Sequence, residues 1–170
     1  MGGGVASDLP VSTDVHVLSE RETAAMNFRD YLTLARTLAG GTTEAEWRSA
    51  SSRAYYAAFH VARLLLLDLG FRVPQADRAH GYLWLRLSNA GHADTTTAGR
   101  NFGQLRRQRN WADYEDLRVI PQTGATQNVQ EAEDIIQALD AATVEPVRTQ
   151  ITDAMKIYER DVLRDVTWHP

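Results

Sequence analysis

The chain has 170 residues, 44% of them hydrophobic and 24% charged, with a formal net charge of −4 and no cysteine. This length suits one domain with a sizeable core, and the lack of cysteine excludes disulfides, a thiolate nucleophile and Cys-ligated metals. The acidic balance argues against a protein that coats nucleic acid non-specifically. Lys156 is the only lysine among the 18 basic residues. This excess of arginine fits either codon usage or phosphate-binding side chains, and composition alone leaves both open.

The first predicted elements are a disordered segment over 1–18 and a helix that follows it. Ser19 and Glu22 have the spacing of a capping box, which marks the start of a helix, and Gly40 marks its end. Apolar residues recur along this segment at steps of three and four, as one face of a helix requires. They are Ala25, Phe28, Leu32, Ala35 and Leu38.

The second predicted helix begins at another capping box, formed by Thr43 and Glu46, and runs to Gly70. It is apolar on almost every side, which is typical of the buried centre of a helical bundle. A third helix is predicted over Ala79–Ala90.

Later segments also have the helical period. A fourth helix is expected from about Ala98 to Val119, then a loop over Gln122–Gln127, and Asn128 is expected to cap a fifth helix. Pro146 separates that helix from a last one. No segment alternates for long enough to predict a strand. The predicted fold is all-α, an up-and-down bundle of five to six helices, in a single domain over 19–165 followed by a tail over 166–170.

Several classes of function lack a motif in this sequence. The histidines show no metal-ligand spacing, and the glycines form neither a dinucleotide-binding nor a P-loop pattern. No metal and no cofactor are therefore predicted. No basic residue precedes Arg21, and the most apolar run, Leu64–Phe71, is far shorter than the ~20 residues of a membrane helix. We expect a cytoplasmic protein that does not associate with membranes.

One polar stripe interrupts the apolar second helix. Arg53, Tyr56, His60 and Arg63 are three, four and three residues apart, so they share one face. An unpaired buried charge costs several kcal/mol, so the arginines must reach water, a carboxylate or a ligand anion. Either they line a phosphate-binding surface or they border a helix contact with their charged ends in water. His60 is either a catalytic residue or a hydrogen-bonded core residue.

A second stripe lies on the fourth predicted helix. Arg109 and Asp113 are four residues apart, as are Asn110 and Tyr114, and Arg106 lies one turn before Arg109. Arginine suits bidentate capture of phosphate, and tyrosine can stack on a base. In the alternative interpretation, Asp113 simply neutralises Arg109 in an exposed ion pair worth a few tenths of a kcal/mol.

Two motifs resemble a known family. Ser52–Leu65 resembles the second-helix signature of HEPN domains (higher eukaryotes and prokaryotes nucleotide-binding), and Leu105–Tyr114 resembles the fourth-helix motif of the same family. His80 lies where many members carry a histidine at the start of the third helix. The resemblance covers about Trp47–Asp140.

The resemblance implies a bundle of about five helices, usually a homodimer, often encoded beside a minimal nucleotidyltransferase antitoxin in toxin–antitoxin or defence modules. Catalytic members are metal-independent ribonucleases with an Arg-x4–6-His motif, in which arginine holds the scissile phosphate. Arg109 matches this arginine and Asn110 the polar residue that often follows it. No histidine follows before His169. The chain instead carries the Arg-Asn-x-Ala-Asp-Tyr variant of the motif.

Two functions are therefore expected as alternatives. The first is a metal-independent endoribonuclease of a toxin–antitoxin or defence-like module. Its catalytic residues would be Arg109, Asn110, Asp113 and Tyr114, with Arg106, Arg53 and His60 binding phosphate. Aspartate ordinarily titrates near pH ~4 and tyrosine near ~10, so His60 or His80 would serve as the base. The second is a catalytically silent module that binds a nucleotide or a nucleotidyltransferase, in which Tyr114 would accept a nucleotidyl group. In a third interpretation, Arg109 and Asp113 form only a salt bridge at a dimer interface.

Overall fold

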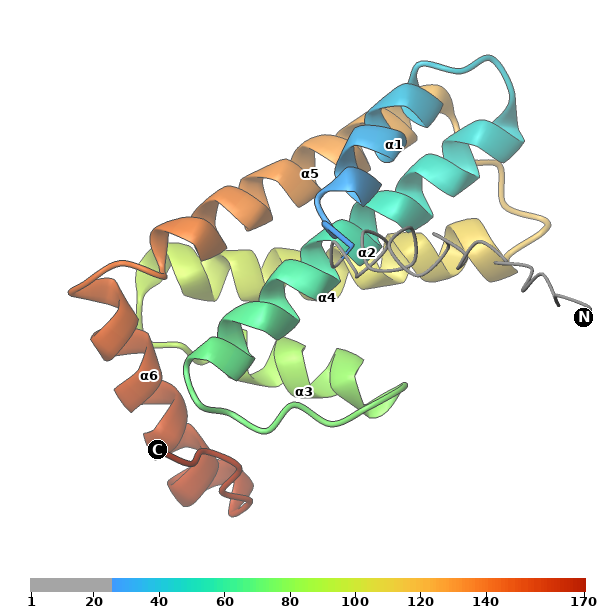
Figure 1. Ribbon diagram of the computed structural model, residues 1–170. Coiled ribbons are helices and arrows are strands. Elements are labelled where there is room, and N and C mark those ends of the chain that lie inside the picture. The colour runs from blue at the N-terminus through green and yellow to red at the C-terminus, as the bar shows by residue number, and fades with distance from the viewer. Residues whose placement is uncertain (1–25) are drawn as a thin grey trace, which may run out of the picture.

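The computed structural model describes residues 26–170, which fold into an all-α bundle (Figure 1). Over this range the elements are α1 (Asp30–Ala39), α2 (Glu44–Asp68), α3 (Arg78–Leu87), α4 (Ala93–Tyr114), α5 (Gln122–Ala141), α6 (Val147–Tyr158) and the π-helical turn η1 (Glu159–Leu163). The predicted helical bundle is thus confirmed. The predicted disordered segment over 1–18 and the capping box at Ser19 and Glu22 lie outside the described residues.

Helix α2 is the centre of the bundle, packing against α1, α3, α4 and α5. Its start matches the predicted capping box: Thr43 Oγ1 accepts from Glu46 N at 3.3 Å, and Glu46 Oε2 accepts from Thr43 N at 2.9 Å. Buried residues occur on most of its circumference, Tyr55 and Leu66 among the largest. The all-round apolar pattern therefore predicted the position of α2 correctly.

The bounds of α4 differ from the prediction at both ends. The helix begins at Ala93 rather than Ala98, because Thr95 is buried in its first turns instead of lying in a loop. It ends at Tyr114 rather than Val119, with Glu115 in a non-helical conformation. Arg48 of α2 donates to the carbonyls of Trp111 and Ala112 at the end of α4, and these contacts account for the earlier end.

The loop predicted over Gln122–Gln127 is wrong, because these residues form the first turns of α5. Gln122 Nε2 donates to the carbonyl of Ala39 at 3.0 Å, and Ala125 is fully buried. Asn128 is not a cap: it lies buried inside α5, where its Nδ2 donates to Ser51 Oγ of α2 at 3.0 Å. Polar residues that resembled local turn and cap signals are instead satisfied by other helices.

Pro146 precedes α6, as predicted, and α6 lies at one end of the bundle beside α3 (Figure 1). The predicted tail over 166–170 pairs with the segment that follows α2. Trp168 Nε1 donates to the carbonyl of Leu69 at 2.8 Å, and His169 N donates to that of Gly70 at 2.9 Å. The C-terminal residues are therefore attached to the bundle.

Gly99→Ala is expected to destabilise the protein by about 1–3 kcal/mol, the usual range for overpacking. A Cβ at Gly99 would lie 2.4 Å from the main-chain carbon of Leu87 and the main-chain nitrogen of Ser88, which cannot rotate away. Gly81→Ala in α3 is the matched control, since nothing lies within 4 Å of its Cβ position. It is expected to stabilise by about 0.5–1 kcal/mol. Urea unfolding measures both, and equal effects of the two substitutions would contradict the close packing of α3 on α4.

Candidate functional site

The guanidinium of Arg109 lies where α4 packs on α2. Its Nη2 donates to the hydroxyl of Tyr56 at 2.6 Å, and its Nη1 donates to Asn110 Oδ1 at 3.1 Å. Asp113 Oδ2 lies 2.8 Å from Nε, yet the Nε–H is buried and makes no hydrogen bond, so this pair is ionic without good hydrogen-bond alignment. The structure thus brings together predicted residues from both polar stripes.

The Asp113 carboxylate has a second partner on α2. Ser52 Oγ donates to Asp113 Oδ2 at 3.2 Å, and Ser52 is itself buried. Ser52 and Tyr56 are one turn apart, so a single face of α2 fixes both the guanidinium and its counter-ion. Ser52 was missed as a site residue, because its role depends on the packing of α2 against α4.

Tyr56, Arg109, Asn110, Asp113 and Tyr114 together form the Arg109 cluster. Tyr114 is its exposed member, with 70% of its surface accessible. Its ring centroid is 5.3 Å from Arg109 Cζ, and that of Tyr56 is 5.1 Å from the same atom. Arg109 therefore makes cation–π contacts with two tyrosines. An exposed aromatic ring beside a fixed cation is an arrangement on which a base can stack while its phosphate is held.

Arg53 and His60 of the first stripe share two aromatic neighbours, Tyr31 and Tyr56. The Cζ of Arg53 lies 5.4 Å from the ring centroids of both Tyr31 and Tyr56, next to the Arg109 cluster. His60 also stacks on Phe28, with centroids 3.8 Å apart and planes 10° from parallel. Burial, and then the charge of Arg63, lower its pKa. His60 therefore lies next to Tyr56, at 6.4 Å between ring centroids, and reaches the Arg109 cluster only through that tyrosine, which accepts from Arg109.

His80 is connected to the arginines more closely. Its Nδ1 shares a short hydrogen bond with the hydroxyl of Tyr55, which is fully buried and whose pKa is raised by burial. Burial lowers the pKa of His80, and the charges of Arg106 and Arg109 lower it further. The imidazole is therefore neutral near pH 7 and able to accept a proton.

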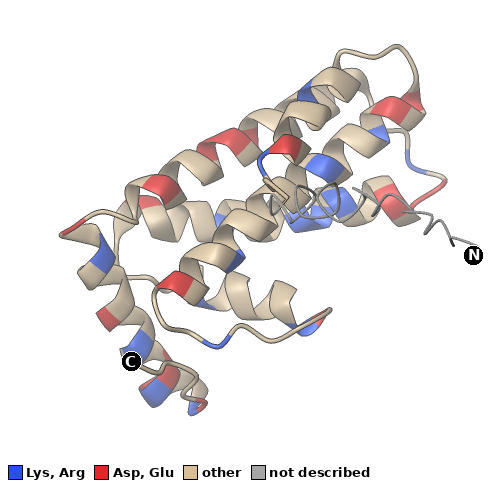
Figure 2. Ribbon diagram, viewed as in Figure 1, with Lys and Arg blue, Asp and Glu red and all other residues tan. Residues whose placement is uncertain are grey.

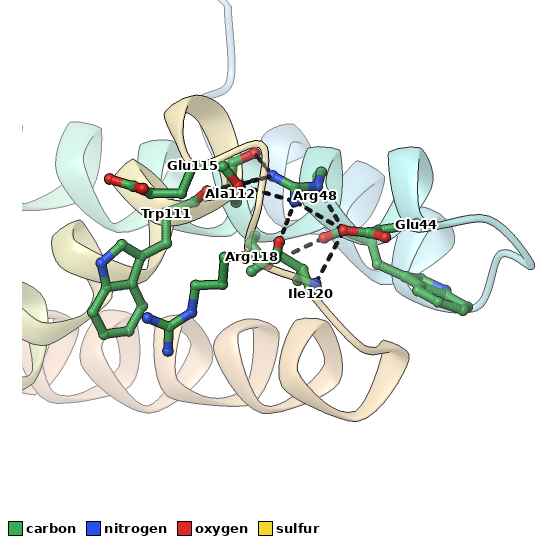
Figure 3. Close-up of polar contacts among 9 residues, drawn as sticks. Glu44, Arg48, Trp111, Ala112, Glu115, Arg118 and Ile120 are labelled. Atoms are coloured by element: carbon green, nitrogen blue, oxygen red, sulfur yellow. Dashed lines mark hydrogen bonds and ion pairs between the residues drawn. The ribbon is translucent and has the colours of Figure 1, made fainter.

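Arg48 is a positioning residue that no sequence motif predicted, and Figure 3 shows its contacts. Its guanidinium donates to main-chain carbonyls at the end of α4 and just beyond it, those of Trp111, Ala112, Glu115 and Arg118. Its Nε donates to Glu44 Oε1 at 2.9 Å, and the same oxygen accepts from Ile120 N at 3.1 Å. These contacts fix the helix end that carries Asp113 and Tyr114. The i,i+4 spacing of Glu44 and Arg48 was the only signal in the sequence.

Several basic residues of α2 and α4 lie near the region where the two helices cross in Figure 2, and others lie further along each helix. Within residues 26–170, Arg106 and Arg107 form no ion pair. The part of the chain that the structure describes contains no group of three acidic or histidine side chains placed to hold a metal ion. It also contains no helix long and apolar enough to cross a membrane.

The sequence matches no family model, and no curated protein or solved structure is significantly similar to it.

Proposed function

We propose that the chain is a HEPN-type helical protein that binds RNA or a nucleotide at the Arg109 cluster and cleaves RNA without a metal. The proposal rests on the resemblance of Ser52–Leu65 and Leu105–Tyr114 to HEPN motifs. The observation that carries it is the arginine held between Tyr56 and Asp113, beside the exposed ring of Tyr114. A homodimer, and a place beside a nucleotidyltransferase antitoxin in a toxin–antitoxin or defence-like module, belong to the same proposal.

Arg109 retains donors for a phosphate. A guanidinium has five N–H groups, and Tyr56 and Asn110 each occupy one on a different terminal nitrogen. One N–H on each terminal nitrogen is left for phosphate oxygens. Because the guanidinium is already oriented by its protein partners, little conformational entropy is lost when it binds an anion.

Cleavage would follow attack by the ribose 2′-hydroxyl on the adjacent phosphorus. The 2′ oxygen forms the new bond to phosphorus while the bond to the 5′ oxygen of the next nucleotide breaks. The departing 5′ oxygen takes a proton from water, which leaves a 2′,3′-cyclic phosphate and a 5′-hydroxyl. Arg109 stabilises the charge on the non-bridging oxygens, and neutral His80 accepts the proton of the 2′-hydroxyl. His80 replaces the histidine that the Arg-x4–6-His motif would place after Arg109. It is preferred to His60 because it hydrogen-bonds to Tyr55, whose ring centroid is 5.5 Å from that of Tyr56, the residue that accepts from Arg109.

The alternative is a silent module that binds a nucleotide or a nucleotidyltransferase. Two observations favour it: no histidine follows Arg109 until His169, and Asp113 already offsets the charge of Arg109 at 2.8 Å. In this case the exposed Tyr114 would accept a nucleotidyl group from the partner enzyme, its phenolic oxygen displacing pyrophosphate from a nucleoside triphosphate.

The test is to incubate purified protein with RNA in EDTA and compare it with Arg109→Ala. We expect the wild type to cleave and the variant to lose at least about 100-fold in rate, the order expected when a transition-state charge contact is removed. Arg36→Ala is the matched control, because Arg36 is a half-exposed arginine on α1 that pairs with Glu133 of α5, away from the Arg109 cluster. Circular dichroism checks that both variants fold.

Full cleavage by Arg109→Ala would refute the role of this arginine. If neither protein cleaves but the variant binds nucleotide at least tenfold more weakly, the silent module is the correct alternative. If the variant changes neither cleavage nor binding, Arg109 and Asp113 form only a structural ion pair.

A further inference from the structure

A cavity lies close to the proposed phosphate site, on the side of α4 that faces α3. It has a volume of about 190 Å³ and is lined by Trp84, Gly103, Arg106, Arg107 and Asn110. Asn110 belongs to both sites, since it lines the cavity and its Oδ1 accepts from Arg109 Nη1. Neither Trp84 nor Gly103 has a role in the function proposed above.

The indole of Trp84 lies against α4 because Gly103 has no side chain. A Cβ at Gly103 would lie 2.6 Å from both Cδ1 and Nε1 of the indole. Although it is held in this way, Trp84 remains 41% exposed, and its Nε1 has no hydrogen-bond partner among residues 26–170. The glycine thus allows a large aromatic ring to be fixed at the surface with part of it open to a ligand.

The polar side of the cavity carries positive charge. Arg106 and Arg107 form no ion pair within the described range. Burial and then the charge of Asp134 raise the pKa of Glu131, and Arg107 is close enough to lower it in part. Asn110 Oδ1 is occupied by Arg109, which leaves its Nδ2 amide as a donor. The cavity therefore offers two guanidinium groups and an amide donor beside an aromatic surface.

We infer that this cavity is a nucleotide subsite, in which a nucleobase stacks on Trp84 while Arg106 and Arg107 hold its phosphate. The inference rests on the proposed function and extends it: Arg109 binds one phosphate of an RNA chain, and the cavity binds the adjacent nucleotide. Stacking on an aromatic side chain accepts any base, so the subsite favours single-stranded RNA without strong sequence preference. An acidic peptide would use the charges but not the flat indole, which is why a nucleotide is preferred.

The test measures fluorescence anisotropy with two labelled octamers, 2′-O-methyl adenylate RNA, which cannot be cleaved by 2′-hydroxyl attack, and an abasic sugar–phosphate chain of equal length. Trp84→Leu is expected to weaken binding of the adenylate octamer at least fivefold and to leave the abasic octamer unchanged. Arg106→Gln is expected to weaken both. Leu117→Ala is the control, since Leu117 is 95% exposed and lines no part of the cavity.

Gly103→Ala removes no ligand contact yet displaces the indole, so it is expected to reproduce the effect of Trp84→Leu. Unlike Gly99→Ala, this substitution meets only the half-exposed side chain of Trp84, which can move, and alanine favours helix over glycine, so failure to fold is not expected to account for the loss. Trp84→Phe keeps an aromatic ring and is expected to retain most of the affinity.

The outcomes separate the subsite from the proposed function. Unchanged adenylate affinity in Trp84→Leu and Gly103→Ala, with weaker binding by Arg109→Ala, overturns the subsite alone. Equal losses for both octamers in Trp84→Leu also overturn it and favour an anionic partner that is not a nucleotide. Weaker binding by Trp84→Leu but not by Arg109→Ala supports the subsite and contradicts the role of Arg109. No binding of either octamer by the wild type overturns both.

Discussion

Glu159→Leu is expected to lower the free energy of unfolding by about 3–5 kcal/mol, because it leaves the Arg86 guanidinium buried without a counter-charge. The Nε of Arg86 lies 2.6 Å from Glu159 Oε1, and the two side chains are 3% and 0% exposed. The Nη2 of Arg86 already lacks a hydrogen-bond partner. Glu159 also accepts from Thr167 N at 2.7 Å and from Trp168 N at 3.2 Å, so it joins α3 to the C-terminal segment.

A double-mutant cycle with Arg86→Met measures this interaction by urea unfolding. Arg86→Met alone is expected to be less harmful than Glu159→Leu, because Thr167 and Trp168 still donate to the carboxylate. The double variant is expected to recover part of the loss, since an apolar pair can replace a buried ion pair. A cost below about 1 kcal/mol for Glu159→Leu would contradict the burial of the pair.

The Arg86–Glu159 pair makes the stability of the fold depend on pH. Burial raises the pKa of Glu159, but hydrogen bonds from Thr167 and then from Arg86 outweigh it, so the pKa lies below its ordinary value of 4.5. A group with a lowered pKa in the folded state stabilises the fold above its unfolded pKa and loses that contribution as the pH falls through the folded pKa. As the pH falls below about 4.5, the wild type is therefore expected to lose the contribution of ionised Glu159 to its free energy of unfolding. The free energy of unfolding of Glu159→Leu is expected to lack this part of the pH dependence.

Local signals in the sequence predicted the helices well where the decisive contacts are also local. The capping box of Thr43 and Glu46 requires only residues three apart, and the structure contains it. Asn128 and Gln122 fit local cap and loop patterns, but their partners, Ser51 and Ala39, are about 80 residues away. Periodicity cannot indicate which distant group satisfies a polar side chain.

The candidate site was predictable to the extent that it lies on one helix. The spacing of Arg109 and Asp113 predicted their ion pair, which the structure contains. The hydrogen bond from Arg109 to Tyr56 depends on how α2 turns against α4, and the sequence did not indicate it. The stacking of His60 on Phe28 likewise depends on tertiary packing, which the spacing on one helix did not indicate. The cavity at Trp84 requires the packing of α3 on α4, which no motif predicted.

Arg48→Met is expected to lower the free energy of unfolding by about 2–4 kcal/mol, since each lost hydrogen bond to a charged donor is worth roughly 1.5–3 kcal/mol and such losses do not add fully. Four carbonyls at the end of α4 and beyond it accept from Arg48. The guanidinium also places positive charge at the C-terminal end of α4, where the helix dipole favours it. Removing this residue frees the segment after Tyr114, so faster amide hydrogen exchange is expected over residues 115–120.

Because Arg48 holds the helix end that carries Asp113 and Tyr114, Arg48→Met is also expected to weaken the proposed RNA binding without removing a side chain of the Arg109 cluster. Arg48→Lys separates charge from geometry: lysine keeps the charge near the helix end, but its compact ammonium cannot span four carbonyls, so intermediate stability and exchange are expected. If Lys restores stability fully, the helix dipole outweighs the carbonyl contacts. If Arg48→Met costs no more than Arg36→Ala, α4 ends at Tyr114 for reasons intrinsic to its own sequence.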